Sequence, residues 1–285
     1  MFEELKNLKA KRIFIQYPEG LKTKIQKIDE EMQNNGFETV LCCEPTFGAC
    51  DVRDVEAKRL GCDAILHIGH SDFGVSSEIP VVYVDYFLKV DPIPIIEKEF
   101  QKIKDYESVG LFTTLQYVPV MKEVEKWLKS RGKKVEVAKT EKHDGQVLGC
   151  RVDAALKLET SCLLYVGTGK FHPLGVALLS NKPVFSLDLE RGEIIDFEKE
   201  KMKYIKKKLW KNEEIKNAKV IGILVSWKKG QNRINEAFAL KHQLEKMGKK
   251  VHILAFDAIS KEKIIGMKFD LTINMACPRM DDEDL

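Results

Sequence analysis

Three cysteines lie in stretches of sequence that are typical of turns. Cysteine thiolates are the ligands that soft metal centres prefer. Cys50 lies in a run of small residues, Gly48-Ala49-Cys50-Asp51, Cys150 follows Gly149, and Cys277 precedes Pro278. Taken singly, each turn is typical of a loop that holds a buried thiol. The cysteines lie far apart in the sequence, so a shared site requires the fold to bring them together.

The composition indicates a globular protein and narrows its functions. The chain has 285 residues, of which 44% are hydrophobic and 32% charged. With 47 basic and 44 acidic residues, the net charge of +3 does not indicate a nucleic-acid-binding protein. Apolar runs stay below the ~18 residues that a membrane span needs. The charged N-terminus does not resemble a signal peptide, so we expect a cytoplasmic protein whose seven cysteines are not a disulfide framework.

Alternating strand and helix patterns predict an α/β protein. Near-continuous β-branched runs indicate parallel sheets covered on both faces. Predicted strands cover residues 11–17, 39–43, 64–69, 81–86, 108–114, 134–138, 162–167, 183–188, 220–227, 250–256 and 269–275. Helices are expected between them, including 51–60 and 151–158, and a lysine-rich helix over 194–217 whose Lys206-Lys207-Lys208 run is expected to face solvent.

The same order of elements recurs in each third of the chain, which predicts three similar domains. Their expected boundaries are 1–90, 91–190 and 191–285. Each domain presents one of the three cysteines at the carboxyl end of its sheet, where open α/β sheets place ligands. A pseudo-threefold arrangement of the domains would therefore bring all three thiolates to one central site.

Three thiolates without a fourth fit a metal centre with one open coordination position. An iron–sulfur cluster is held by cysteine thiolates, and a 4Fe–4S cluster with three protein ligands leaves one iron for a substrate or cofactor. Zinc sites more often use closely spaced cysteine pairs, and the sequence contains no C-x-x-C motif. Cys42, Cys43, Cys62 and Cys162 lie in or beside predicted strands and are interpreted as structural.

Several other polar residues follow predicted strands and are candidates for cofactor contacts. Gln116 and Gln231 occupy comparable positions after the first strands of the second and third domains. His67 and His70 flank a glycine at another strand end, where they either line the cavity or bind backbone groups. The run around His172, with Gly167 and Gly169, is either a cofactor-binding loop or a tight turn from strand to helix.

Six motifs together resemble the archaeal diphthamide biosynthesis enzymes, the 2-(3-amino-3-carboxypropyl)histidine synthases. They extend along essentially the whole chain: Tyr17-Pro18-Glu19-Gly20-Leu21, Phe47-Gly48-Ala49-Cys50-Asp51-Val52, His67-Ile68-Gly69-His70-Ser71, Gly145-Gln146-Val147-Leu148-Gly149-Cys150, Gly167-Thr168-Gly169-Lys170-Phe171-His172-Pro173-Leu174-Gly175 and Ala276-Cys277-Pro278-Arg279. The family usually continues past the position of Leu285, so we expect the third domain to be incomplete at its C-terminus.

The resemblance implies a transferase, a non-canonical radical enzyme that uses S-adenosylmethionine. One cysteine from each of three α/β domains binds a 4Fe–4S cluster, and these map onto Cys50, Cys150 and Cys277. One-electron reduction cleaves S-adenosylmethionine at the open iron, and the 3-amino-3-carboxypropyl group is added to a histidine of translation elongation factor 2. The resemblance also implies a homodimer and an electron donor.

In this family context, the Gly167–Gly169–His172 loop helps to bind the cofactor. Arg279 either neutralises part of the cluster's charge, holds the methionine carboxylate, or is an exposed arginine at a strand end. Two other functions stay open. One is a quinolinate synthase-like 4Fe–4S dehydratase with a small substrate, and the other is a non-catalytic α/β partner protein. The combined motifs favour the transferase.

Overall fold

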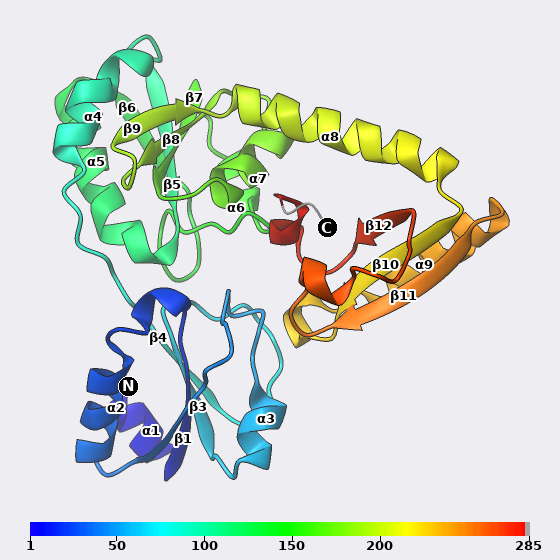
Figure 1. Ribbon diagram of the computed structural model, residues 1–285. Coiled ribbons are helices and arrows are strands. Elements are labelled where there is room, and N and C mark those ends of the chain that lie inside the picture. Colours follow the sequence, from blue (N-terminus) through cyan, green and yellow to red (C-terminus); the bar gives the residue numbers. More distant parts are fainter. Residues whose placement is uncertain (283–285) are drawn as a thin grey trace. The chain divides into compact units, whose positions relative to one another are not determined.

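The structure, a computed structural model, describes residues 1–282 and the side chains of residues 1–280. The described residues form three sheets of parallel strands, and among these strands only β9 runs antiparallel to its neighbour (Figure 1). The predicted α/β class with three similar parallel sheets is confirmed. The chain forms two compact units: unit 1 contains Met1–Tyr86 and Glu214–Leu285, and unit 2 contains Phe87–Glu213. The predicted boundaries near residues 90 and 190 and the pseudo-threefold arrangement stay predictions.

The first sheet of unit 1 has the strand order β2-β1-β3-β4. Side chains alternate along the central strand β1, so Ile13 and Ile15 pack beneath α2 while Phe14 packs with Ala57 of α3. The elements are α1 (Phe2–Asn7), β1 (Arg12–Gln16), η1 (Glu19–Leu21), α2 (Ile25–Asn34), β2 (Glu38–Leu41), α3 (Asp54–Arg59), β3 (Ala64–Ile68) and β4 (Val81–Val84).

The second sheet of unit 1 has the order β11-β10-β12. Ile221, Ile223 and Val225 on one face of β10 pack against Ala237 and Leu244 of α9. The elements are β10 (Val220–Ser226), η4 (Lys229–Gln231), α9 (Ile234–Lys246), β11 (Lys250–Phe256), η5 (Lys261–Lys263), β12 (Leu271–Asn274) and η6 (Pro278–Asp282). The short helices η4 and η6 follow the carboxyl ends of β10 and β12, where they carry candidate site residues.

Unit 2 contains a five-stranded sheet in the order β6-β5-β7-β8-β9, with helices on both faces (Figure 1). Leu164 of β7 packs with α5, and the neighbouring Tyr165 packs with α7 on the opposite face. The elements are α4 (Ile93–Glu99), η2 (Phe100–Lys102), β5 (Ser108–Thr113), η3 (Leu115–Tyr117), α5 (Val118–Ser130), β6 (Lys134–Val137), α6 (Asp153–Leu156), β7 (Cys162–Gly167), α7 (Phe171–Leu179), β8 (Val184–Asp188) and β9 (Glu193–Asp196).

The helix expected over 194–217 begins later, as α8 (Glu198–Asn217). Residues Glu193–Asp196 form β9 instead, because the alternation of a strand lets the neighbours Ile194 and Ile195 pack into the cores on opposite faces of the sheet. None of the α8 residues is buried, which agrees with a solvent-facing lysine run. The helices expected over 51–60 and 151–158 are also shorter than predicted. Among residues 1–282, no helix combines the length and hydrophobicity needed to cross a bilayer.

Candidate functional site

The turn that carries Cys50 is fixed to the first sheet by a buried glutamine at the carboxyl end of β1. The side-chain amide of Gln16 donates to the Asp51 carbonyl at 3.0 Å, and its oxygen accepts from the Arg53 backbone N–H at 3.0 Å. Gln16 is fully buried, so these bonds satisfy polar groups that water does not reach. They hold residues 51–53 out of the helix, which explains why α3 begins only at Asp54.

The same turn is clamped from the other sheet of unit 1 by η4. The Gly230 backbone N–H donates to the Cys50 carbonyl at 2.9 Å, and a Cβ atom at Gly230 would lie only 2.6 Å from the Cys50 Cα. The side-chain amide of Gln231 donates to the Cys50 sulfur at 3.3 Å. Gln231, predicted as a cofactor contact, therefore approaches the Cys50 sulfur itself.

Ion pairs with buried members connect the Cys50 turn to the segments that follow β10 and β11. The Lys228 ammonium contacts the Asp51 carboxylate at 2.5 Å, and their side chains are only 5% and 3% exposed. Arg53 pairs with Asp257 at 2.8 Å, and Lys229 pairs with Asp54. Burial raises the pKa of the Asp51 carboxyl, and the bond with Lys228 opposes this rise. Because a buried charge without its partner is costly, these pairs favour one position of the Cys50 turn relative to both other segments.

The turn that carries Cys277 also contacts the Cys50 turn. The side-chain amide of Asn274, at the end of β12, donates to the Cys277 carbonyl at 2.9 Å. The Arg279 guanidinium, two residues further, lies 5.3 Å from the ring centre of Phe47. Phe47 belongs to the Cys50 turn, so unit 1 brings two of the three candidate cysteine turns into one region.

A neutral histidine pair stands at the carboxyl end of β3. The His67 Nε2 and the His70 Nδ1 lie 3.0 Å apart, and the buried His67 Nδ1 has no hydrogen-bond partner among the described residues. Burial, with a smaller contribution from the nearby His70, lowers the pKa of His67 to about 3. Burial and then the positive charge of Arg279 lower the pKa of His70 to about 4. At pH 7 the two histidines are therefore neutral, and they lie near the positive charge of Arg279.

In unit 2, the Cys150 turn is held by close backbone packing on α7. The Gly149 backbone N–H donates to His172 Nδ1 at 3.1 Å. A Cβ atom at Gly175 would lie 2.3 Å from the Gly149 carbonyl oxygen, so only glycine permits this approach. The structure thus gives His172, predicted as a cofactor contact, a defined role in positioning the Cys150 turn.

The remaining candidates of unit 2 gather at the same end of its sheet. Gly167 ends β7, and Gly169 adopts a left-handed φ of 76° in the turn before α7. The Thr168 hydroxyl lies 3.4 Å from the Tyr117 hydroxyl, which brings this turn beside η3, the short helix that contains Gln116. The structure therefore groups Cys150 with all four predicted cofactor contacts of unit 2. The approach of this group to Cys50 and Cys277 stays a prediction.

The seven cysteines differ in their accessibility. Cys42, Cys62 and Cys162 are buried, and burial raises the pKa of each thiol, to about 12 for Cys162. Such thiols are poor metal ligands, because a ligand must lose its proton. Cys50, Cys150 and Cys277 are partly or fully exposed, and so is Cys43. Within either unit, the described residues form no group of three or more His, Cys, Asp or Glu side chains placed to hold a metal ion.

Sequence reasoning missed the residues that hold the Cys50 turn in place. Gln16 was a usable signal, since it is a polar residue that directly follows the apolar run of β1. Lys228 was also missed, because a lysine after a strand is usually exposed. Its burial depends on Asp51, which lies in a distant part of the sequence.

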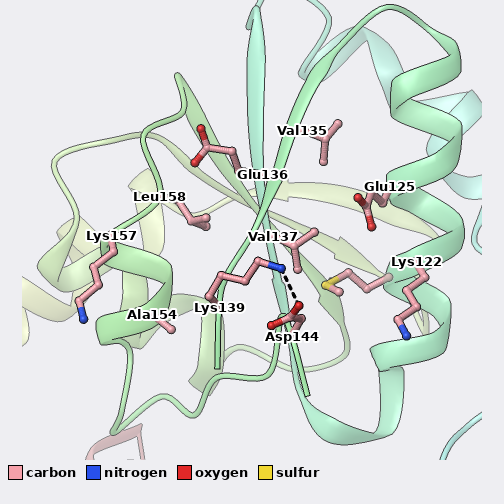
Figure 2. A pocket seen from close by; sticks show the side chains of 11 residues that line it. Lys122, Glu125, Val135, Glu136, Val137, Lys139, Asp144, Ala154, Lys157 and Leu158 are labelled. Atoms are coloured by element: carbon pink, nitrogen blue, oxygen red, sulfur yellow. Dashed lines mark hydrogen bonds and ion pairs between the residues drawn. The ribbon is translucent and has the colours of Figure 1, made fainter. Parts of the chain in front are cut away.

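Unit 2 contains a cavity of about 500 Å³ beside the edge strand β6, as Figure 2 shows. The positive and negative charges of its lining residues are equal in number, and Lys139 pairs with Asp144 at 2.6 Å. None of the predicted site residues lines this cavity. It is therefore separate from the cysteine turns. The lining residues are Met121, Lys122, Glu125, Val135, Glu136, Val137, Lys139, Asp144, Ala154, Lys157 and Leu158.

Comparisons with known proteins agree on one family. The sequence model of the family described as "Putative diphthamide synthesis protein" matches residues 17–284. The chain is 33% identical to the 2-(3-amino-3-carboxypropyl)histidine synthase of Pyrococcus horikoshii, across 100% of this chain and 83% of the relative. It is 29% identical to the protein of the same name from Methanocaldococcus jannaschii, across 98% and 82%. The crystal structure of Dph2 from Pyrococcus horikoshii with a 4Fe–4S cluster has a TM-score of 0.89 and 32% identity, and the match covers 98% of this chain and 83% of that one.

The close contact at Gly230 predicts a specific loss of stability. The Gly230→Ala substitution adds a Cβ atom that overlaps the Cys50 backbone, so we expect the free energy of unfolding to fall by about 1–3 kcal/mol. Gly20→Ala is the matched control, because a Cβ atom there meets nothing within 4 Å. Thermal unfolding of the two variants measures the difference. Equal unfolding temperatures would contradict the clamp.

The histidine pair predicts how stability depends on pH. His67 and His70 have folded pKa values of about 3 and about 4, below the unfolded value of 6.5. Below pH 6.5 the unfolded chain therefore binds protons that the folded chain does not. Stability falls by roughly 2 kcal/mol per histidine between pH 6.5 and pH 5.

Denaturant unfolding at pH 7 and pH 5 measures this loss, which should shrink in the His67→Gln/His70→Gln variant. His242, whose side chain is 69% exposed, provides the control variant His242→Gln, which should keep the wild-type loss. The same pH dependence in the double variant and the wild type would rule out the neutral pair.

Proposed function

Because the chain belongs to the diphthamide synthesis protein family, we propose that it is a 2-(3-amino-3-carboxypropyl)histidine synthase that catalyses the first step of diphthamide synthesis. It transfers the 3-amino-3-carboxypropyl group of S-adenosylmethionine to a histidine of translation elongation factor 2. The observation that carries this proposal is the full-length match, with a TM-score of 0.89, to a Dph2 structure that contains a 4Fe–4S cluster.

The donor set of this chain fits such a cluster. Cys50, Cys150 and Cys277 are the proposed ligands, because each is an accessible thiol in a turn at the carboxyl end of a sheet. Three thiolates leave one iron position for S-adenosylmethionine. When bound, the cluster supplies the electron that cleaves the bond between the sulfur and the γ-carbon of S-adenosylmethionine.

The chain's own residues position the thiolates and receive the polar ends of the co-substrate. Gln231 donates to the Cys50 sulfur and so orients it. Arg279 supplies a positive charge near the Cys277 turn for the methionine carboxylate. Gln116, with the turn that contains Gly167, Gly169 and His172, is the proposed cofactor-binding region of unit 2.

The larger assembly belongs to the same proposal. We propose three domains, 1–90, 91–190 and 191–285, whose pseudo-threefold arrangement would bring the three cysteines together. The functional protein is a homodimer that receives electrons from a separate donor. Its reaction takes place in the cytoplasm, where its substrate serves translation.

The transfer reaction itself tests this function. The protein is reconstituted with iron and sulfide without oxygen, then reduced in the presence of S-adenosylmethionine and elongation factor 2. We expect one histidine of the factor to gain the mass of a 3-amino-3-carboxypropyl group while 5′-methylthioadenosine is released. If the factor gains no mass although the cluster is loaded and reduced, the proposed function is wrong.

The ligand assignment has its own prediction. Cys50→Ala, Cys150→Ala and Cys277→Ala should each lose most of the iron, about four atoms per chain, that the reconstituted wild type binds. Cys43→Ala is the matched control, because Cys43 is also exposed, and Cys62→Ala removes a buried thiol. Both controls should keep the iron. Full iron binding by any of the first three variants would remove that cysteine from the ligand set.

A further inference from the structure

An exposed aromatic ring in unit 1 lies within 6 Å of two cations. Phe47, in the Cys50 turn, is 50% exposed. The Lys228 ammonium lies 5.9 Å and the Arg279 guanidinium 5.3 Å from its ring centre. Both distances are within the range in which a cation is attracted to an aromatic face. Burial in a core does not explain the position of this ring, but the two cations do.

The two cations have different partners. Lys228 is buried and its charge is neutralised by Asp51 at 2.5 Å. Arg279 has no carboxylate partner within 4 Å among the described side chains, and its charge reaches His70, whose pKa it helps to lower. An aromatic ring can hold a guanidinium without neutralising it, whereas a carboxylate would compete with an anionic ligand.

We propose that Phe47 is a positioning residue, which holds the Arg279 guanidinium in place and leaves its charge available to the carboxylate of the co-substrate. The inference rests on the proposed function, since it takes S-adenosylmethionine as the ligand. The contact also ties the Cys50 turn to the Cys277 turn. The Phe47 ring thus links the segments that carry the proposed cluster ligands Cys50 and Cys277. The same contact holds Arg279, the proposed anion-binding group.

The ring's position in the Cys50 turn makes this arrangement specific. Residues 51–53 are fixed by Gln16, and the Cys50 carbonyl is bound by Gly230. Phe47 therefore directly precedes a segment that is bound to both sheets of unit 1, which restricts where its ring can lie. Arg279 lies on the short helix η6, and its long side chain has many rotamers in water. Stacking on the ring reduces this freedom before the ligand arrives, which lowers the entropic cost of binding.

Binding of S-adenosylmethionine to the anaerobically reconstituted holoenzyme tests the inference. Phe47→Leu keeps an apolar side chain but removes the aromatic face, so we expect the dissociation constant to rise about threefold to tenfold. Phe47→Tyr keeps an aromatic ring and should bind S-adenosylmethionine as tightly as the wild type does. Phe238→Leu is the control, because Phe238 on α9 is 47% exposed, close to the value of Phe47.

Decarboxylated S-adenosylmethionine separates positioning from general damage. Because it lacks the carboxylate, its affinity should be the same for wild type and Phe47→Leu. Iron content and unfolding temperature of each variant show that the protein is folded and loaded. A Phe47→Leu protein that binds S-adenosylmethionine as tightly as the wild type, or that loses both ligands equally, overturns the inference while the proposed function stands. A loaded wild type that binds no S-adenosylmethionine overturns both.

Discussion

The candidate site depends on the buried contact between the Cys50 turn and the segment that follows β10. Lys228 and Asp51 form an ion pair with almost no exposure to water, and Gly230 packs directly on the Cys50 backbone. Removing one partner of a buried pair typically costs about 3–5 kcal/mol, so the two sheets of unit 1 have one strongly preferred relative position. This relative position fixes where the Cys50 sulfur, Gln231 and the Phe47–Arg279 pair lie.

Unit 2 reaches a similar result by different means. Its cysteine turn is held by close backbone packing, because Gly149 and Gly175 allow two backbone segments to touch. The imidazole of His172 then fixes the N–H group next to Cys150. In both units, the cysteine side chain is left accessible while the backbone beside it is held by polar contacts. Such an arrangement suits a ligand that must keep its geometry when a metal centre binds or changes charge.

Much of the fold could be predicted from the sequence because its strands are long apolar runs between clear helix patterns. Strand β11 was predicted over the residues that form it, and the three parallel sheets follow from the repeated order of elements. The strand β9 could not be told from the start of a helix, since Ile194 fits the apolar pattern of either. The three cysteine turns were identified from residue type and position. The contacts that hold them were not, because Gln16, Lys228 and Gly230 act across long sequence separations that no local pattern reveals.

In the proposed enzyme, three cysteines from three sheets hold one cluster with a single open iron. Mössbauer spectroscopy of the ⁵⁷Fe-reconstituted protein, with and without S-adenosylmethionine, tests it most directly. We expect one iron in four to change its signal when the co-substrate binds, because only one iron lacks a cysteine ligand. Four irons that remain equivalent, or a spectrum unchanged by a saturating concentration of S-adenosylmethionine, would contradict it.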